Sequence, residues 1–189
     1  MNASEGMEEK TEKKELITTI EHYKPLGMQI LIGDKSDLQA TGFSYGDRAI
    51  AKVVEVTRDG VTWQSPASEL KWRLGFVSLN SDEFYINFSK AKANTIKVVN
   101  GDGIKLHVWP DTSKYGADMP EELEAMLNQE PEFNRRFHAK TPGYQRTFIH
   151  AISGYKTSAT RLKHAIRLMR NFMNMPEGKE SIGDVVRGK

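Results

Sequence analysis

Two kinds of hydrophobic pattern occupy different parts of this chain. From Leu16 to about Val108, short runs rich in β-branched and aromatic residues are separated by turn residues, as in AIAKVVEVT followed by RDG. After WPDTSKYG the pattern becomes helical and stays so to about Met175. Because the two patterns do not alternate, the sequence predicts an α+β fold: an N-terminal small β-barrel or curled antiparallel sheet followed by a C-terminal module of three to four helices.

The same pattern places the boundaries of the segments. The motif TRDGVTW predicts a tight hairpin, since Asp-Gly suits the positive φ angles of a two-residue turn, and NGDG is a second turn signal. Both ends of the chain are polar and lack a periodic apolar pattern. We therefore expect a disordered tail at 1–14, a β-barrel domain at 15–111, a linker at 112–117, a helical module at 118–175 and a flexible tail at 176–189.

Composition excludes several classes of site. The 189 residues include no cysteine, so disulfides, thiolate zinc sites and cysteine nucleophiles are excluded. The histidines are scattered, without the His-Glu spacing of a hydrolytic zinc site, and no catalytic motif is complete, so we expect no metal, cofactor or catalytic residue.

The location of the protein is predicted from its apolar segments. No stretch approaches the roughly 20 apolar residues of a membrane span. The N-terminal MNASEGMEEKTEKKEL also lacks the apolar core of a secretion signal. We therefore expect a cytoplasmic protein.

Charge is distributed unevenly along the helical part. The net charge of +2 conceals a stretch between Glu132 and Glu177 that has no acidic residue. That stretch holds nine cations: Arg135, Arg136, Lys140, Arg146, Lys156, Arg161, Lys163, Arg167 and Arg170. Acids are concentrated just before it, in MPEELEAMLNQEPEF, so the basic stretch can be partly neutralised within the protein.

The last predicted helix contains most of these cations. On a helical wheel, one apolar stripe holds Leu162, Ala165, Ile166, Met169, Phe172 and Met173. Lys163, Arg167 and Arg170 fall on the opposite side, as expected of a solvated face. Arg161 lies at the border of the stripe and in the first turn, where the helix dipole disfavours a cation.

Arg161 is therefore expected to have a specific partner. One hypothesis is a structural ion pair with a carboxylate, from Glu121, Glu122 or Glu124. The other is an anionic ligand that Arg161 binds together with Lys156 and Arg146.

Three aromatic residues of the β region are a second candidate site. Trp63, Trp72 and Tyr85 either belong to the core or rim of the barrel, or line an open barrel mouth where a small ligand could stack.

The helical part resembles a known family. Residues 110–169 contain, in order, PEEL, PEF with an Arg-Phe, TPG with QR, a Lys after Ala-Ile-Ser, and a Thr-Arg that opens the last helix. This string is similar to the C-terminal region of the YdeI/OmpD-associated family, also described as bacteriocin-protection proteins. The resemblance implies an upstream small β-barrel domain, which residues 43–111 match in part, and an association with antimicrobial-peptide tolerance or envelope stress. It implies no catalytic residues.

These observations predict a non-enzymatic cytoplasmic binding protein of the YdeI/OmpD-associated type, which binds a small anionic ligand or a protein partner and takes part in a stress response. A nucleic-acid-binding protein is an alternative, because the cations are interleaved with Phe137, Tyr144, Phe148 and Tyr155, which could stack on bases. A second alternative is a small-molecule-binding barrel, or an enzyme with an unrecognised site.

Overall fold

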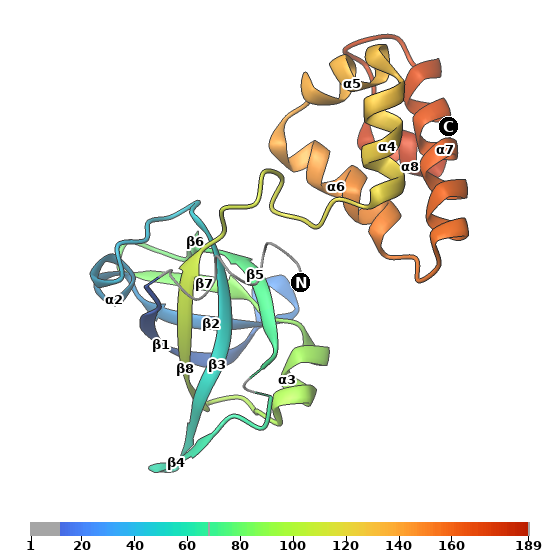
Figure 1. The fold of residues 1–189 in the computed structure, drawn as a ribbon. Coiled ribbons are helices and arrows are strands. Elements are labelled where there is room, and N and C mark those ends of the chain that lie inside the picture. The colour runs from blue at the N-terminus through green and yellow to red at the C-terminus, as the bar shows by residue number, and fades with distance from the viewer. Residues whose placement is uncertain (1–11, 68, 189) are drawn as a thin grey trace. The chain divides into compact units, whose positions relative to one another are not determined.

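The computed structural model describes residues 12–67 and 69–188, and the chain divides into two compact units, Met1–Asp111 and Thr112–Lys189 (Figure 1). All strands of the described residues lie in the first unit, and every element after Asp111 is a helix. The α+β fold class is therefore confirmed.

Within residues 12–67 and 69–111, the first unit contains eight strands and short helical segments. The strands are β1 (Lys14–Tyr23), β2 (Met28–Asp34), β3 (Arg48–Arg58), β4 (Val61–Gln64), β5 (Lys71–Gly75), β6 (Val77–Ser78), β7 (Glu83–Asn87) and β8 (Gly103–Pro110). The helical segments are η1 (Lys24–Leu26), α2 (Lys35–Ala40) and α3 (Lys90–Ile96).

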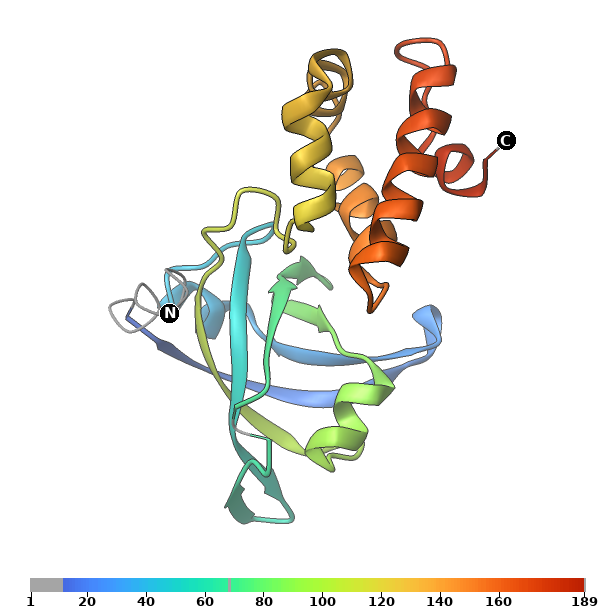
Figure 2. The same cartoon turned by 45° about the vertical axis from the view of Figure 1, so that its right-hand side comes forward.

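These strands form one antiparallel sheet that is curled but not closed. Its order is β4, β3, β8, β1, β2, β7 and β6, and β5 pairs with the part of β3 that β4 leaves free. Figure 2 shows β1 and β2 running across the direction of β3 and β8, which makes the curl visible. Of the two predicted arrangements, a closed barrel or a curled sheet, the structure has the curled sheet.

The inner face of the curled sheet holds the core of this unit. Alternate residues of the longer strands point into it, such as Leu16, Val53, Leu74, Phe84 and Leu106. The predicted hairpin between β3 and β4 is confirmed: Asp59 and Gly60 both have positive φ angles, 51° and 80°.

The second unit contains five helices: α4 (Glu121–Gln129), α5 (Pro131–His138), α6 (Pro142–Ser153), α7 (Ser158–Asn174) and α8 (Ile182–Arg187). Threonines begin two of them, because the hydroxyl of Thr141 accepts the N–H of Tyr144 and that of Thr157 accepts the N–H of Thr160. The cap at Thr141 thus determines where α6 starts.

Aromatic residues from α5, α6 and α7 form the centre of this unit. Ring centroids of Phe133 lie 5.8 Å from Phe148 and 5.7 Å from Phe172, and Phe137 lies 5.6 Å from Phe148. The segment expected to be a flexible tail, 176–189, instead contains α8, whose Val185 is fully buried in the same core. Burial of this apolar side chain explains why α8 packs on the unit.

None of the helices within residues 12–67 and 69–188 has the length and apolarity needed to cross a bilayer.

Candidate binding site on helix α7

The buried face of α7 is centred differently from the predicted stripe. Ala165, Leu168 and Phe172 are fully buried, whereas Leu162 is 44% exposed. On the helical wheel, Arg161 falls in line with the three buried residues, and Leu162 falls roughly a quarter-turn away from them. The prediction that Leu162 belongs to the core is therefore wrong, and an apolar side chain is left on the outer surface.

Arg161 binds one of the carboxylates proposed for it. Its Nε donates to Oε2 of Glu122 at 2.9 Å, and its Nη1 donates to the carbonyl oxygens of Tyr155 and Lys156 at 3.3 and 3.2 Å. Hydrogen bonds from Arg161 and Ser158 lower the pKa of the buried Glu122 carboxyl to about 2. Arg161 thus ties the α6–α7 connection and α7 to α4.

The other two cations proposed for the same anion do not join Arg161 on a shared partner. Arg146 donates its Nε to the carbonyl oxygen of Tyr115 at 3.2 Å. Lys156 is exposed and contributes its backbone carbonyl to Arg161. The structure therefore places a protein carboxylate at Arg161, and the three cations have separate environments.

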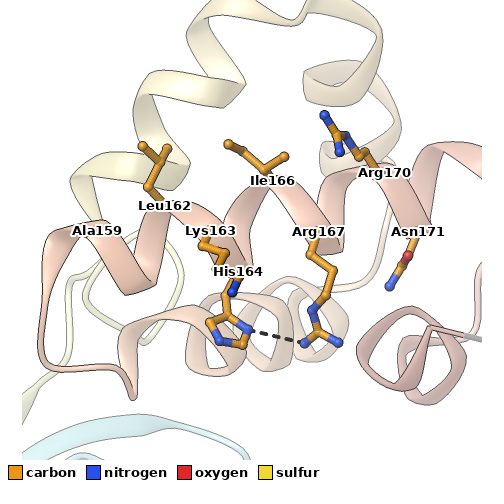
Figure 3. Close-up of a pocket in the computed structure, with 8 residues that line it drawn as sticks. All are labelled: Ala159, Leu162, Lys163, His164, Ile166, Arg167, Arg170 and Asn171. Atoms are coloured by element: carbon orange, nitrogen blue, oxygen red, sulfur yellow. Dashed lines mark hydrogen bonds between the residues drawn. The ribbon is translucent and has the colours of Figure 1, made fainter.

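A groove runs along the outer surface of α7. It has a volume of about 670 Å³ and is lined by Ala159, Leu162, Lys163, His164, Ile166, Arg167, Arg170 and Asn171. Figure 3 shows Leu162, Ile166 and Arg170 projecting from one side of the helix, and His164, Arg167 and Asn171 from the other. The lining combines apolar side chains with three cations and includes no acid.

Hydrogen bonds hold one wall of the groove in place. Nη1 of Arg167 donates to the carbonyl oxygen of Val186 at 3.3 Å, and its Nη2 lies 3.3 Å from Nδ1 of His164. The imidazole of His164 in turn stacks on Tyr155, with ring centroids 3.8 Å apart. Asn171 donates to the carbonyl oxygen of Val185 at 2.9 Å. The α8 backbone and Tyr155 therefore orient this wall, while Lys163 and Arg170 extend into solvent.

A buried ionic cluster, which the sequence did not reveal, closes the end of α7. Both oxygens of Glu180 are engaged: Oε1 accepts from Arg136, with the Nε–Oε1 distance at 3.0 Å, and Oε2 accepts from Lys140 at 2.5 Å. Arg136 also donates to the carbonyl oxygens of Phe172 and Met175. Burial raises the pKa of Glu180, but hydrogen bonds from Lys140 and Arg136 outweigh it and lower the pKa to about 2.

The three aromatic residues predicted for a barrel mouth are not gathered at one site. Trp72 points inward, 5.8 Å from Phe88, with Nζ of Lys92 5.7 Å from its ring centroid. Trp63 lies on β4 beneath the guanidinium of Arg58. Tyr85 alternates with the buried Phe84 and Ile86, so it lies on the outer face of the sheet. Within residues 12–67 and 69–188, no three His, Asp or Glu side chains come together as a potential metal site.

Comparisons with known proteins bear on the helical unit. A search of curated proteins gives no match. Residues 116–173 match the model of the family described as Bacteriocin-protection, YdeI or OmpD-Associated. The matched residues lie within the helical unit and reach the last turn of α7. The match confirms the resemblance predicted for this region.

Proposed function

We propose that the chain is a non-enzymatic binding protein, and that the outer face of α7 docks an acidic, amphipathic segment of a partner protein. The observation that carries the proposal is the groove on α7, where exposed Leu162 and part-buried Ile166 lie among Lys163, Arg167 and Arg170. We call this surface the α7 face.

The mixture of cationic and apolar side chains on the α7 face indicates what kind of partner it can bind. Three cations without an acid in the lining favour a negatively charged partner. Burial of Leu162 and Ile166 against apolar side chains of a partner would contribute to the free energy of binding. A nucleic-acid backbone offers no such apolar side chains. The groove extends from Ala159 to Asn171, roughly 18 Å along the helix at about 1.5 Å per residue, which suits about three turns of a partner helix.

Several acids of the helical unit pair with cations outside the α7 face. Glu122 pairs with Arg161, Glu177 with Arg135, Glu180 with Arg136 and Lys140, and Asp184 of α8 with Arg187. The cations of the α7 face are therefore not neutralised by these carboxylates.

The family description supports the biological side of the proposal. Because the matched model is described as bacteriocin-protection, we propose that this binding contributes to antimicrobial-peptide tolerance or to a response to envelope stress. A cytoplasmic location stays a prediction from the sequence.

The proposal can be tested by fluorescence anisotropy with two labelled peptides of about four helical turns each. One contains Glu with Leu at helical spacing, and the other contains the same number of Glu residues without Leu. We expect the Glu/Leu peptide to bind the full chain roughly 10-fold more tightly, the gain expected from burying one or two leucines. Leu162→Ser should remove that preference.

A charge-matched pair of variants provides the control. Replacing Lys163, Arg167 and Arg170 with Gln should weaken the binding of the Glu/Leu peptide roughly 10-fold or more, because the replacement removes the complementary charge. Replacing the exposed Lys114, Lys156 and Lys179 with Gln should have little effect. Equal losses in both triple variants would contradict a specific face. Tighter binding of an oligothymidylate, weakening steeply with salt, would instead support the nucleic-acid alternative.

A further inference from the structure

A chain of hydrogen bonds in the helical unit joins a tyrosine, a histidine and an asparagine. Oη of Tyr115 lies 2.9 Å from Nε2 of His138. Nδ1 of His138 lies 3.0 Å from the backbone carbonyl oxygen of Asn134 and 2.8 Å from its Oδ1. A hydroxyl, an imidazole and an orienting polar group, in this order, are the parts of an activated nucleophile and its base. None of the three residues belongs to the α7 face.

The direction of each hydrogen bond in this chain follows from its partners. A backbone carbonyl oxygen can only accept, so Nδ1 of His138 carries the proton and donates to Asn134. In the neutral imidazole the other nitrogen, Nε2, then has a free lone pair, and the hydroxyl of Tyr115 donates to it. The phenol is therefore bonded to a base that can take its proton.

Further contacts hold the three side chains in place. Nδ2 of Asn134 donates to the carbonyl oxygen of Leu127 in α4 at 2.8 Å, which directs Oδ1 toward the histidine. The backbone carbonyl oxygen of Tyr115 accepts from Nε of Arg146 at 3.2 Å. The ring of Tyr115 packs edge-on to the buried Phe137, with ring centroids 6.2 Å apart. Residues of α4, α5 and α6 thus set the geometry of the site.

The site is open to reagents in solution. His138 is exposed and Tyr115 is half-buried. Nζ of Lys114 lies 5.0 Å from the centre of the Tyr115 ring, so a positive charge lies beside the ring that becomes negative as its proton leaves.

We propose that Tyr115 is an acylation site that takes an acyl group from an activated carboxylic ester or thioester. Oη of Tyr115 attacks the carbonyl carbon, and its proton passes to Nε2 of His138. As the new carbon–oxygen bond forms, the bond from the carbonyl carbon to the leaving oxygen or sulfur breaks, and His138 gives the proton to the leaving group. The products are a tyrosyl ester and an alcohol or thiol, with no change of oxidation state.

The chain contains an internal control for this reaction. Tyr155 is 37% exposed and also contacts a histidine. Among the described residues, however, Tyr155 stacks flat on His164, with ring centroids 3.8 Å apart, and forms no hydrogen bond to it. Tyr155 therefore offers an accessible phenol beside an imidazole, but without the hydrogen bond that makes His138 a base for Tyr115.

The experiment treats the full chain with p-nitrophenyl acetate at neutral pH and follows acetylation of each tyrosine over time by peptide mass spectrometry. Hydroxylamine removes acetyl groups from tyrosyl esters and leaves acetyl-lysine intact, so the two products are distinguished. We expect Tyr115 to be acetylated about 100-fold faster than Tyr155, at the lower end of what a positioned general base contributes.

Two variants assign the effect to the base. His138→Gln can still accept a hydrogen bond but cannot take up the proton, so acetylation of Tyr115 should slow to about the rate of Tyr155. His164→Gln removes the other histidine and should change neither rate. The acetylation of Tyr155 in each variant, together with a thermal melt, shows whether the variant is folded as the parent is.

Either of two results would overturn the proposal. The first is acetylation of Tyr115 in the parent within about threefold of Tyr155, far below the contribution of a general base. The hydrogen bond would then serve only to hold Tyr115 on α5. The second is a folded His138→Gln variant in which Tyr115 is acetylated as fast as in the parent.

Discussion

Arg161 is a cation whose partner is a carboxylate of the protein itself. Its guanidinium contacts Glu122 and two backbone carbonyl oxygens at once, a set of acceptors that suits a planar fork. The side chain therefore joins three parts of the helical unit, and its role is structural.

Substitution of Arg161 tests this role. Arg161→Lys keeps the charge but loses the fork, so we expect Lys and Ala variants both to lower the melting temperature by several degrees. Added phosphate or sulfate should not change the difference between parent and variant, since the acceptor is Glu122. An anion-dependent stabilisation that only the parent shows would instead indicate a ligand site at Arg161.

Glu180 is the residue whose loss should be most costly in the helical unit. Its carboxylate is fully buried between Arg136 and Lys140. Glu180→Gln leaves the buried Arg136 and the part-buried Lys140 without their counter-charge, so we expect a loss of about 3 kcal/mol in the free energy of unfolding, measured by urea denaturation.

Glu177→Gln is the matched control for that experiment. Glu177 pairs with Arg135, and both side chains are more than half exposed, so the change should cost under about 1 kcal/mol. Similar losses in the two variants would mean that burial does not distinguish the two ion pairs.

Helix α8 depends on tertiary contacts more than on its own sequence. It has only six residues, too few for an isolated helix, and Val185 anchors it in the core. It also supplies the carbonyl oxygens that hold Arg167 and Asn171 on the α7 face.

Two truncations separate the contribution of α8 from that of Glu180. A chain that stops after Ser181 keeps Glu180 and loses α8, and should lose on the order of 2 kcal/mol of stability through exposure of the surface around Val185. A chain that stops after Met175 also loses Glu180 and should be less stable by roughly a further 3 kcal/mol. Thermal and urea unfolding measure the stability of both truncated chains. If neither truncation changed the stability, the segment 176–189 would behave as the flexible tail that the sequence predicts.

The helices illustrate which features a sequence reveals. A local signal placed the Asp-Gly hairpin correctly, because turn preferences act between near neighbours. The pairing of Arg161 followed from a wheel position and a nearby acidic helix. Glu180 was missed because it lies in the segment 176–189, which the sequence predicted to be a flexible tail, and its burial beside Arg136 depends on how that segment packs.

In the β region, the sequence did not reveal which way the aromatic side chains point. The sequence leaves Trp72 either in the core or rim of a barrel or at an open barrel mouth, and the structure buries it on β5, which pairs with β3. Whether an aromatic side chain points inward depends on strand register, which puts Trp72 inside and Tyr85 outside.

Acid should destabilise the helical unit. The folded-state pKa of both Glu122 and Glu180 is about 2, below the ordinary value of 4.5. A lowered pKa means that these carboxylates stabilise the fold fully above about pH 4.5, and that this stabilisation is lost as the pH falls toward about 2.

Thermal melts between pH 7 and pH 2 check this expectation. The parent should lose melting temperature progressively below about pH 4.5. A double variant, Glu122→Gln with Glu180→Gln, should start from a lower melting temperature and depend less on pH in that window. Parallel curves for parent and double variant would assign the acid sensitivity to other groups.

The position of β8 in the sheet determines the order in which the first unit can assemble. This strand lies between β3 and β1 and pairs with both, and the hydroxyl of Thr18 bonds to the carbonyl oxygen of Ile104 across 86 residues. During synthesis, β1 and β2 can pair at once, as can β3 and β4, but each hairpin keeps one open edge until Gly103–Pro110 has emerged. Joining them requires closure of a long loop, which is slow, whereas the helical unit is rich in local contacts that form quickly. Until its middle strand has emerged, a newly made chain therefore exposes the edges of β1 and β3 that β8 will cover, in addition to the outer edges of the sheet, and this interval is when it is most open to aggregation.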